Sequence, residues 1–196
     1  MLGHMVYHTL SHVKNFDIFD LSGRRKLNKN TVLCDIENLN ELKSIIQNIR
    51  PDFIINCIGL LIKGSSENKE KAIFINAYLP NFLQSISEEF KFKLVHISTD
   101  CVFSGKVGKY SERSIPDSNE LYGKTKSLGE FNDNKNLCIR TSIIGLEIKS
   151  KGEGLMHWLF SQSGKIYGFK NVFWSGVTTL ELSKSILFAL NNNITG

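Results

Sequence analysis

The chain has 196 residues, of which 41% are hydrophobic and 22% charged, with 15 glycines and 3 prolines. This composition is too apolar for a disordered chain and too poor in glycine and proline for a fibrous one. The longest apolar run, Phe53 to Ile62, is shorter than the roughly 20 residues that cross a bilayer, which excludes a membrane-spanning protein. The net charge of +5 suits a small polyanionic ligand at least as well as a nucleic acid.

Short apolar runs alternate with longer segments of helical periodicity as far as Arg140. Continuously apolar runs are typical of parallel strands that are buried on both faces. The predicted strands are Phe16–Phe19, Thr31–Cys34, Phe53–Cys57, Lys93–Ile97 and Leu137–Arg140, and the predicted helices are Leu2–Val13, Leu39–Ile49, Asn68–Phe90 and Asn119–Phe131. This alternation predicts right-handed β-α-β units, and therefore an α/β fold with a doubly wound parallel sheet.

The pattern becomes less regular after Ser142. A stretch rich in Gly and Lys leads to an amphipathic segment, Leu155–Gln162, and then to a last helix near Leu180–Asn191. We interpret these residues as substrate-side structure rather than as further regular sheet.

The cysteines and the N-terminal histidines give no sign of a metal or disulfide framework. The cysteines have no C-x-x-C spacing and follow apolar runs, so we expect reduced structural thiols in a cytoplasmic chain: Cys34, Cys57, Cys101 and Cys138. His4, His8 and His12 share one helix face, as zinc ligands can, but no acidic residue or Cys nearby completes a set. We therefore predict no metal site.

Polar side chains follow the predicted strand Lys93–Ile97, where Ser98, Thr99 and Asp100 stand in sequence. Ligands of open α/β sheets bind beyond the carboxyl ends of the strands, so these side chains are expected to face a crevice. Tyr122 and Lys126, four residues apart on a predicted helix, lie on one face.

A phenol with a pKa of about 10 is a poor proton donor at neutral pH. A nearby ammonium lowers that pKa, so we expect Lys126 to bring Tyr122 toward its working range. With a strand-end hydroxyl, the pair can protonate a carbonyl oxygen while a hydride arrives at the carbon.

Three segments together resemble the dTDP-4-dehydrorhamnose reductase branch of the extended short-chain dehydrogenase/reductases: residues 98–105 (STDCVFSG), 110–112 (YSE) and 121–130 (LYGKTKSLGE). The resemblance runs along nearly the whole chain and implies a Rossmann-like fold. It also implies NADPH-dependent reduction of a 4-keto-6-deoxy sugar nucleotide for surface polysaccharide precursors. Thr99 would then be the hydroxyl partner, Tyr122 the acid, and Lys126 the residue that tunes it and holds the nicotinamide ribose.

The same resemblance implies a set of cofactor-binding residues besides Tyr122 and Lys126: Gly3, Arg24, Arg25, Asp35, Ile36, Asn56, Cys57, Ile58 and Thr141. Asn56–Gly59 resembles the turn that lines the cofactor, and it is also typical of a buried strand end. Asp35 and Ile36 resemble a step beside the adenine, although Asp35 is equally suited to cap the next helix. Thr141 belongs to a strand end that resembles one near the nicotinamide.

The nucleotide preference depends on residues after the first predicted strand. An acidic residue there favours NAD, whereas an Arg accommodates the 2′-phosphate of NADP. Asp20 therefore favours NAD, whereas the pair Arg24 and Arg25 favours NADP. We predict NADPH, with NADH left open; surface arginines in solvent are the alternative interpretation.

Three residues are expected on the substrate side: Asp100, Phe103 and Trp174. Residues 174–179 resemble the late loop that reaches the substrate in this branch, although core packing suits the tryptophan equally well. The expected ligand is a nucleotide-linked deoxy sugar, with no nucleic acid and no membrane, and a homodimer is left open.

Relatives of this branch begin with a strand followed by G-x-x-G-x-L-G-H, of which only the end is matched, by Met1–His4 with Gly3 as the last glycine. We expect the first strand and the C-terminal elements of the fold to be missing. Residues 1–142 would then be a partial Rossmann-like domain and residues 143–196 a partial substrate-side region. Neighbouring strands would expose unpaired edges, and NADPH would bind weakly.

Two other functions are open. The β-subunit of methionine adenosyltransferase belongs to the same branch but serves as a partner, and the missing glycines favour such a binding role. Thr99, Tyr122 and Lys126 favour the enzyme. A sugar epimerase or dehydratase fits less well, because those relatives usually carry an acidic pair where Cys101 follows Asp100.

Overall fold

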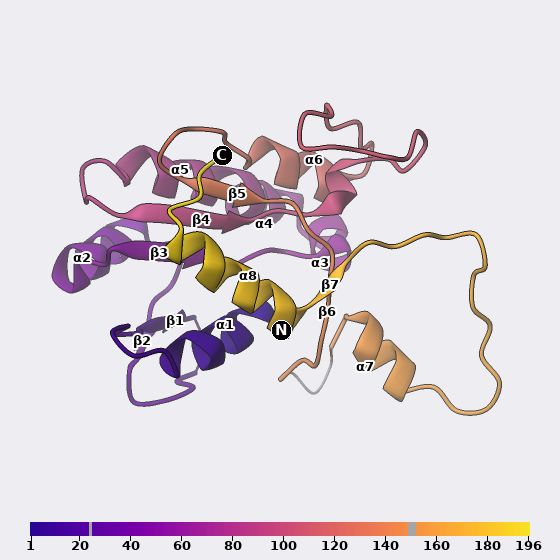
Figure 1. Ribbon diagram of the computed structural model, residues 1–196, viewed down its shortest axis with the longest axis horizontal. Helices are drawn as coiled ribbons and strands as arrows, with labels where there is room; N and C mark the ends of the chain where they lie inside the picture. The colour runs from indigo at the N-terminus through magenta and orange to yellow at the C-terminus, as the bar shows by residue number, and fades with distance from the viewer. Residues whose placement is uncertain (24, 149–151) are drawn as a thin grey trace. The chain divides into compact units, whose positions relative to one another are not determined.

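The computed structural model describes residues 1–23, 25–148 and 152–196, and its chain divides into two compact units (Figure 1). The larger unit comprises Asp17–Arg140 with Ile194–Gly196, and the smaller comprises Met1–Phe16 with Thr141–Asn193. The functional division predicted at residue 142 stays a prediction.

The larger unit contains two parallel sheets. In the first, β1 (Asp20–Ser22) pairs with β2 (Thr31–Leu33); the second has the order β3 (Phe53–Asn56), β4 (Lys93–Ile97) and β5 (Leu137–Ile139). All pairings are parallel, which confirms the predicted α/β class. Among the residues described, β1 and β3 each have a strand partner on one side only.

The first strand differs from its prediction. Phe16–Phe19 lies outside any strand, and the ladder with β2 begins where Asp20 faces Thr31. The Asp20 carboxylate accepts hydrogen bonds from Thr31 Oγ1 at 2.9 Å and from Asn28 Nδ2 at 2.9 Å. These side-chain bonds hold Asp20 against Thr31 at the first pair of the ladder.

The helices of this unit are α2 (Leu39–Ile49), α3 (Ile62–Glu67), α4 (Lys69–Ile73), the π-helical turn η1 (Phe74–Tyr78), α5 (Leu79–Ile86), the 3₁₀ turn η2 (Asp100–Val102) and α6 (Leu121–Leu128). The single helix predicted over Asn68–Phe90 is therefore divided by η1. α2 has its predicted bounds, and Asn38 caps it by accepting from Glu41 N at 3.2 Å. α3 was not predicted.

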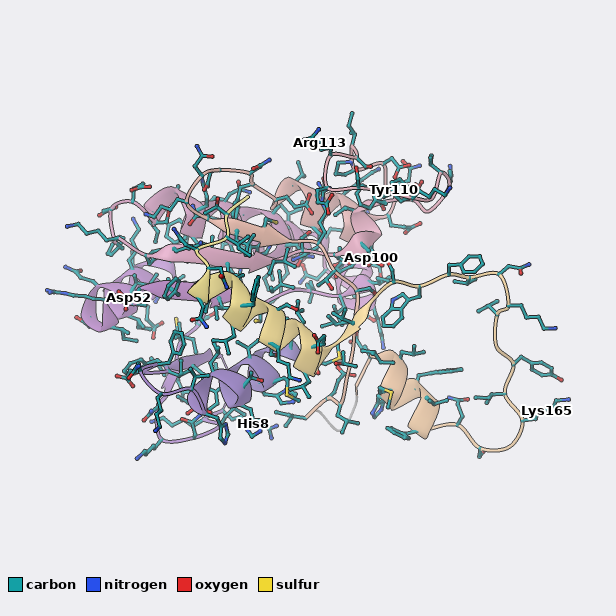
Figure 2. The ribbon with its side chains drawn as sticks, viewed as in Figure 1. His8, Asp52, Asp100, Tyr110, Arg113 and Lys165 are labelled. Carbon is teal, nitrogen blue, oxygen red and sulfur yellow. The ribbon has the colours of Figure 1, made fainter. Side chains whose placement is uncertain are left out.

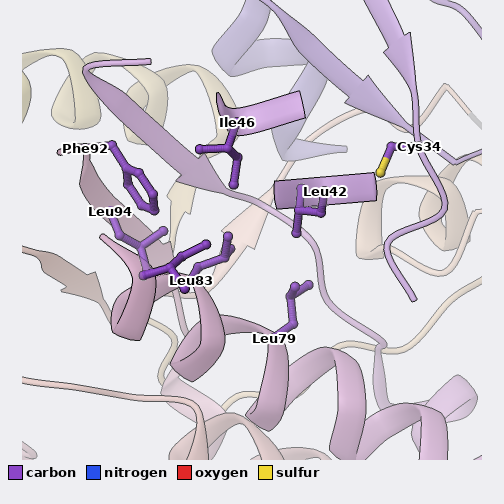
Figure 3. Packing of buried hydrophobic residues seen from close by; sticks show 8 residues of the cluster. Cys34, Leu42, Ile46, Leu79, Leu83, Phe92 and Leu94 are labelled. Carbon is purple, nitrogen blue, oxygen red and sulfur yellow. The ribbon is translucent and has the colours of Figure 1, made fainter. Parts of the chain in front are cut away.

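The core of the larger unit lies between α2, α5 and β4 (Figure 3). Leu42 and Ile46 come from one face of α2, Leu79 and Leu83 from α5, and Leu94 from β4. Burying one such side chain contributes about 1.5–3 kcal/mol. These contacts fix β4, and with it the residues that follow its carboxyl end.

The smaller unit is built from α1 (Leu2–Ser11), β6 (Ile143–Ile144), α7 (Leu155–Phe160), β7 (Val177–Thr178) and α8 (Thr179–Asn191). α1 packs against α8 through the face that buries Leu2, Val6 and Leu10. None of the helices in the described part of the chain is long and apolar enough to cross a membrane.

Candidate active site

The carboxyl ends of β3, β4 and β5 meet at one edge of their sheet because the three strands are parallel. β3 ends at Asn56, β4 leads into Thr99, and β5 leads into Arg140. In Figure 2, Asp100 lies at this edge and Tyr110 lies on the loop that follows it. Ligands of open α/β sheets bind at such an edge, so the residues here are the candidate site.

Thr99 is the first polar group of the site. Its backbone is extended, its side chain is buried, and its Oγ1 caps η2 by accepting from Cys101 N at 3.2 Å. The same hydroxyl lies 3.2 Å from Asp100 Oδ1, to which it can donate, and it is close enough to the Tyr122 phenol to oppose the rise in the pKa of that group. The structure thus brings together the strand-end hydroxyl and the phenol that the sequence predicts to act together.

Two glycines let α6 approach its neighbours. A side chain at Gly123 would overlap the carbonyl oxygen of Cys101 and the side chain of Ser118. One at Gly129 would overlap the backbone of Asn76 in η1. Both glycines therefore stand where α6 contacts other backbone closely, and this contact places Tyr122 and Lys126 beside the end of β4.

Lys126 is almost completely buried, with its amine against β4. Nζ donates to the carbonyl oxygen of Ile97 at 2.6 Å and lies 3.4 Å from Nε2 of His96. Burial lowers the pKa of Lys126 to about 8, and the opposing influence of Cys138 and Glu130 is smaller. At neutral pH the lysine is therefore mostly charged, and it loses its proton as the pH rises above about 8.

The expected effect of Lys126 on Tyr122 is not what the structure shows. Burial raises the pKa of Tyr122, the hydrogen bond with Thr99 opposes that rise, and the nearby Asp100 adds to it. The expected lowering is therefore wrong for this state of the site. The physical reason is that desolvation penalises the phenolate and that Nζ of Lys126 is directed to the Ile97 carbonyl.

Asn76 is a site residue that the sequence analysis missed. It lies fully buried in η1; its Oδ1 accepts from Leu60 N and its Nδ2 donates to Leu60 O, both at 2.9 Å. Nδ2 also lies 3.3 Å from Oγ1 of Thr125, the neighbour of Lys126. Asn76 therefore joins the loop after β3 to α6. Asn76 lies in a π-helical turn, which the sequence analysis did not predict; such turns are common at functional sites.

The residues predicted for the substrate side lie in different units. Asp100 and Phe103 belong to the larger unit, where the Phe103 ring stacks on Tyr110 at 4.3 Å between centroids and under the Arg140 guanidinium at 5.1 Å. Trp174 belongs to the smaller unit, is exposed, and donates from Nε1 to Ser142 Oγ at 2.8 Å.

The predicted cofactor residues are likewise divided. Arg25, Asp35, Ile36, Asn56, Cys57 and Ile58 belong to the larger unit, whereas Gly3 and Thr141 belong to the smaller one; Arg24 lies outside the described residues. Arg25 is exposed. Asp35 accepts from Glu37 N at 3.1 Å, and because Asn38 caps α2, the alternative role of Asp35 as helix cap is wrong.

All four cysteines are unpaired thiols. Burial raises the pKa of Cys57 to about 12 and that of Cys138 to about 11, so both thiols near Lys126 are uncharged at neutral pH. Within the described ranges, no group of three or more His, Cys, Asp or Glu side chains is placed to hold a metal ion.

The family model described as "RmlD substrate binding domain" matches residues 2–163. The chain belongs to this family. The family is one of RmlD-like, NAD(P)-dependent reductases of the extended short-chain type, with a Rossmann-like fold. The match spans the sheet edge, Thr99 and α6, and it confirms the family that the sequence motifs indicate.

The similar solved structures include the following two. A hypothetical dTDP-4-dehydrorhamnose reductase from Sulfolobus tokodaii is 28% identical with a TM-score of 0.86, covering 100% of this chain and 70% of that chain. A dTDP-4-dehydrorhamnose reductase from Bacillus anthracis, solved in complex with NADP, is 26% identical with a TM-score of 0.71, covering 85% and 62%.

A curated relative, methionine adenosyltransferase 2 subunit beta from Xenopus laevis, is 34% identical over 45% of this chain and 27% of its own length. The chain spans about a third of the length of the curated relatives that it matches first.

Proposed function

We propose that this chain carries the catalytic residues of an NADPH-dependent reductase that acts on the keto group of a nucleotide-linked 4-keto-6-deoxy sugar, in the synthesis of surface polysaccharide precursors. The observations that support the proposal are the position of Thr99 directly after β4, the influence of Thr99 on the Tyr122 phenol, and the Lys126 amine on the carbonyl oxygen of Ile97. Two reductases of dTDP-4-dehydrorhamnose are among the similar solved structures, which supports the substrate class.

Each of these residues has a role that its surroundings support. The Tyr122 hydroxyl donates its proton to the carbonyl oxygen of the sugar as that oxygen gains negative charge. Thr99, whose hydroxyl influences the Tyr122 phenol, orients that phenol toward the substrate. With the cofactor bound, Lys126 in its charged form would favour the phenolate that remains; in this structure its amine donates to the Ile97 carbonyl oxygen instead.

The donor set fits a nicotinamide dinucleotide. The Lys126 amine and Tyr122 hydroxyl can hold its ribose, the exposed Ile58 and Gly59 after Asn56 can lie along it, and the exposed Arg25 suits a 2′-phosphate. NADPH, when bound, supplies the hydride that reduces the carbonyl carbon. The side chains of this chain supply the proton and the orientation.

The test follows the absorbance of NADPH with dTDP- and UDP-linked 4-keto-6-deoxy sugars at high cofactor concentration. We expect turnover by the parent and a loss of about 100-fold or more in Tyr122→Phe, which removes the proton donor. Tyr78→Phe is the matched control, because Tyr78 is half exposed on η1 and its ring stacks on Phe74 and Phe82. A Tyr122→Phe chain as active as the parent contradicts the mechanism.

A second candidate is a binding role, favoured by the 34% identity to methionine adenosyltransferase 2 subunit beta. In that case the chain would bind a methionine adenosyltransferase and would not reduce a sugar. Co-purification with a methionine adenosyltransferase, combined with the turnover assay, separates the two functions. Complex formation without NADPH oxidation supports the binding role, and oxidation that Tyr122→Phe abolishes supports the reductase.

A further inference from the structure

A buried histidine on β4 joins the lysine of the site to the end of β3. His96 is completely buried, and its two ring nitrogens face different neighbours. Asn56 Nδ2 lies 3.2 Å from His96 Nδ1, and Lys126 Nζ lies 3.4 Å from His96 Nε2. The register of β3 and β4 places Asn56 opposite His96. The proposed reduction uses Lys126 and leaves His96 without a role.

The hydrogen bonds of Asn56 determine which nitrogen of His96 carries the proton. Asn56 Oδ1 accepts from the backbone N–H of Ile58 at 3.1 Å, which turns the amide nitrogen toward the imidazole. That nitrogen is only a donor, so His96 Nδ1 must accept. Burial, aided by the charge of Lys126, holds the pKa of His96 well below its usual range. The ring is therefore neutral, and its one proton is on Nε2.

The Nε2–H group of His96 faces the amine of Lys126. An ammonium has only donors, so it cannot accept this hydrogen, whereas an uncharged amine has a lone pair that can. Nζ also donates to Ile97 O at 2.6 Å. The uncharged amine thus has a suitable partner on both sides, and the ammonium meets a donor on one of them.

We propose that His96 is a positioning residue that donates its Nε2–H to Lys126 and thereby favours the uncharged form of that lysine. The lowered pKa of Lys126 agrees in direction. Of the other titratable groups that face Nζ, Glu130 after α6 favours the charged form, and the thiols of Cys138 on β5 and Cys57 after β3 do so only at the high pH at which they ionise. His96 opposes them, and the balance determines the pH at which Lys126 changes charge.

The kinetic consequence rests on the proposed reductase function. If charged Lys126 assists Tyr122, the rate falls as pH rises through the pKa of Lys126. Removing the donor at His96 raises that pKa and moves the fall in rate to higher pH. A residue with a purely structural role would lower the rate at every pH and leave the position of the fall unchanged.

The first test measures the tautomer directly in the parent chain and needs no activity. Long-range ¹⁵N–¹H correlation spectra of ¹⁵N-histidine-labelled protein distinguish Nε2–H from Nδ1–H, and loss of one signal in His96→Gln assigns His96 among the five histidines. We expect a neutral ring with Nε2 protonated from pH 5.5 to 9. A proton on Nδ1, or a charged imidazole within that range, overturns the proposal.

The second test titrates Lys126 by the ¹³Cε shift of labelled lysine, assigned with Lys126→Met. In His96→Gln a side-chain carbonyl can replace Nε2–H, and we expect the pKa of Lys126 to rise by about one unit or more. His96→Asn keeps an acceptor for Asn56 but does not reach Nζ, so its rise should be smaller. Unchanged titration in both variants overturns the proposal.

The kinetic arm compares the pH profile of kcat for the parent and for His96→Gln. We expect the pH at which kcat falls to rise by as many pH units as the pKa of Lys126 rises. A parent with no turnover at any pH contradicts the reductase function, and the two spectroscopic results still decide the role of His96. If His96→Gln does not fold, the tautomer of His96 measured in the parent chain decides whether the proposal holds.

Discussion

The guanidinium of Arg140 is paired with the carboxylate of Glu130. Arg140 Nε lies 3.0 and 3.1 Å from the two carboxylate oxygens, and Nη2 lies 2.8 Å from Oε2. Ser98 Oγ donates to the same carboxylate at 2.6 Å, and Arg140 Nη1 reaches the carbonyl oxygen of Glu112 at 3.2 Å. The pair therefore links the ends of β4, α6 and β5 with the loop that carries Phe103.

Arg140→Lys is expected to weaken this link. A lysine keeps the charge but cannot make the forked contact, so Glu130 loses part of its pairing and the loop loses its anchor. The expected loss is about 1–3 kcal/mol of unfolding free energy, measured by urea denaturation. Arg113→Lys, an exposed position on the same loop (Figure 2), is the control. Equal stability of the two variants would contradict the importance of the pair.

Asn76→Ala is expected to detach the loop after β3 from α6. The change leaves the N–H and the carbonyl oxygen of Leu60 without their partner, at a cost of about 2–4 kcal/mol. Asn76→Asp keeps the acceptor for Leu60 N but places a buried carboxylate against the carbonyl oxygen of Leu60, so its loss of stability should be at least as large. Urea denaturation measures both, with Asn40→Ala on the exposed face of α2 as the control. A loss of unfolding free energy no larger than that of the control would show that the contacts of Asn76 with Leu60 and Thr125 are dispensable for stability.

Gly123→Ala is expected to push α6 away from η2, because the new side chain would overlap Cys101 O and Ser118. Overpacking of this kind costs about 1–3 kcal/mol. Tyr122 follows the helix, so turnover should fall together with stability. Gly23→Ala is the matched control, since its added carbon meets Cys34 O at an ordinary 3.6 Å. An active and fully stable Gly123→Ala would mean that α6 tolerates the shift.

Asp133 should make stability depend on pH in the acid range. Burial raises the pKa of its carboxyl, but hydrogen bonds from Asn136, Lys135 N and Gln84 outweigh burial and lower it to about 2. A depressed pKa stabilises the fold above the unfolded value near 3.8, and this contribution is lost as pH falls toward 2.

The measurement for Asp133 compares the parent with Asp133→Asn by urea denaturation at pH 6 and at pH 2.5. At pH 6 the parent should be more stable than Asp133→Asn by about 1–2 kcal/mol, a value reduced for solvent screening. This difference in unfolding free energy should be smaller at pH 2.5. A gap that is the same at both pH values would exclude the titration of Asp133 as its source.

We expect the 196-residue chain to bind NADPH weakly. Among the described residues, no strand pairing joins the β1–β2 pair to the β3–β4–β5 sheet, so the strands beside the cofactor site have unpaired edges. Fluorescence titration with NADPH measures the affinity. Tight, stoichiometric binding by the chain alone would refute this expectation.

Local features of the site followed from the residues themselves. β4 and α2 have their predicted bounds, because a continuous apolar run and a regular helical period each favour one local structure. Thr99 stands after a strand, and Tyr122 and Lys126 stand on one helix, as their spacing predicts. The motifs that contain them indicated the family before any contact was known.

The long-range relationships were decided by the tertiary structure. Asn76 meets Leu60 and Thr125, and His96 meets Asn56 and Lys126, across 16 to 49 residues of chain. No local pattern encodes these contacts, because strand register and the close approach of α6 at its glycines bring them about. The pKa of Tyr122 likewise depends on burial that only packing produces. The sequence by itself determined which groups could react, and the packing around β4 decided which of them meet and in which state of charge.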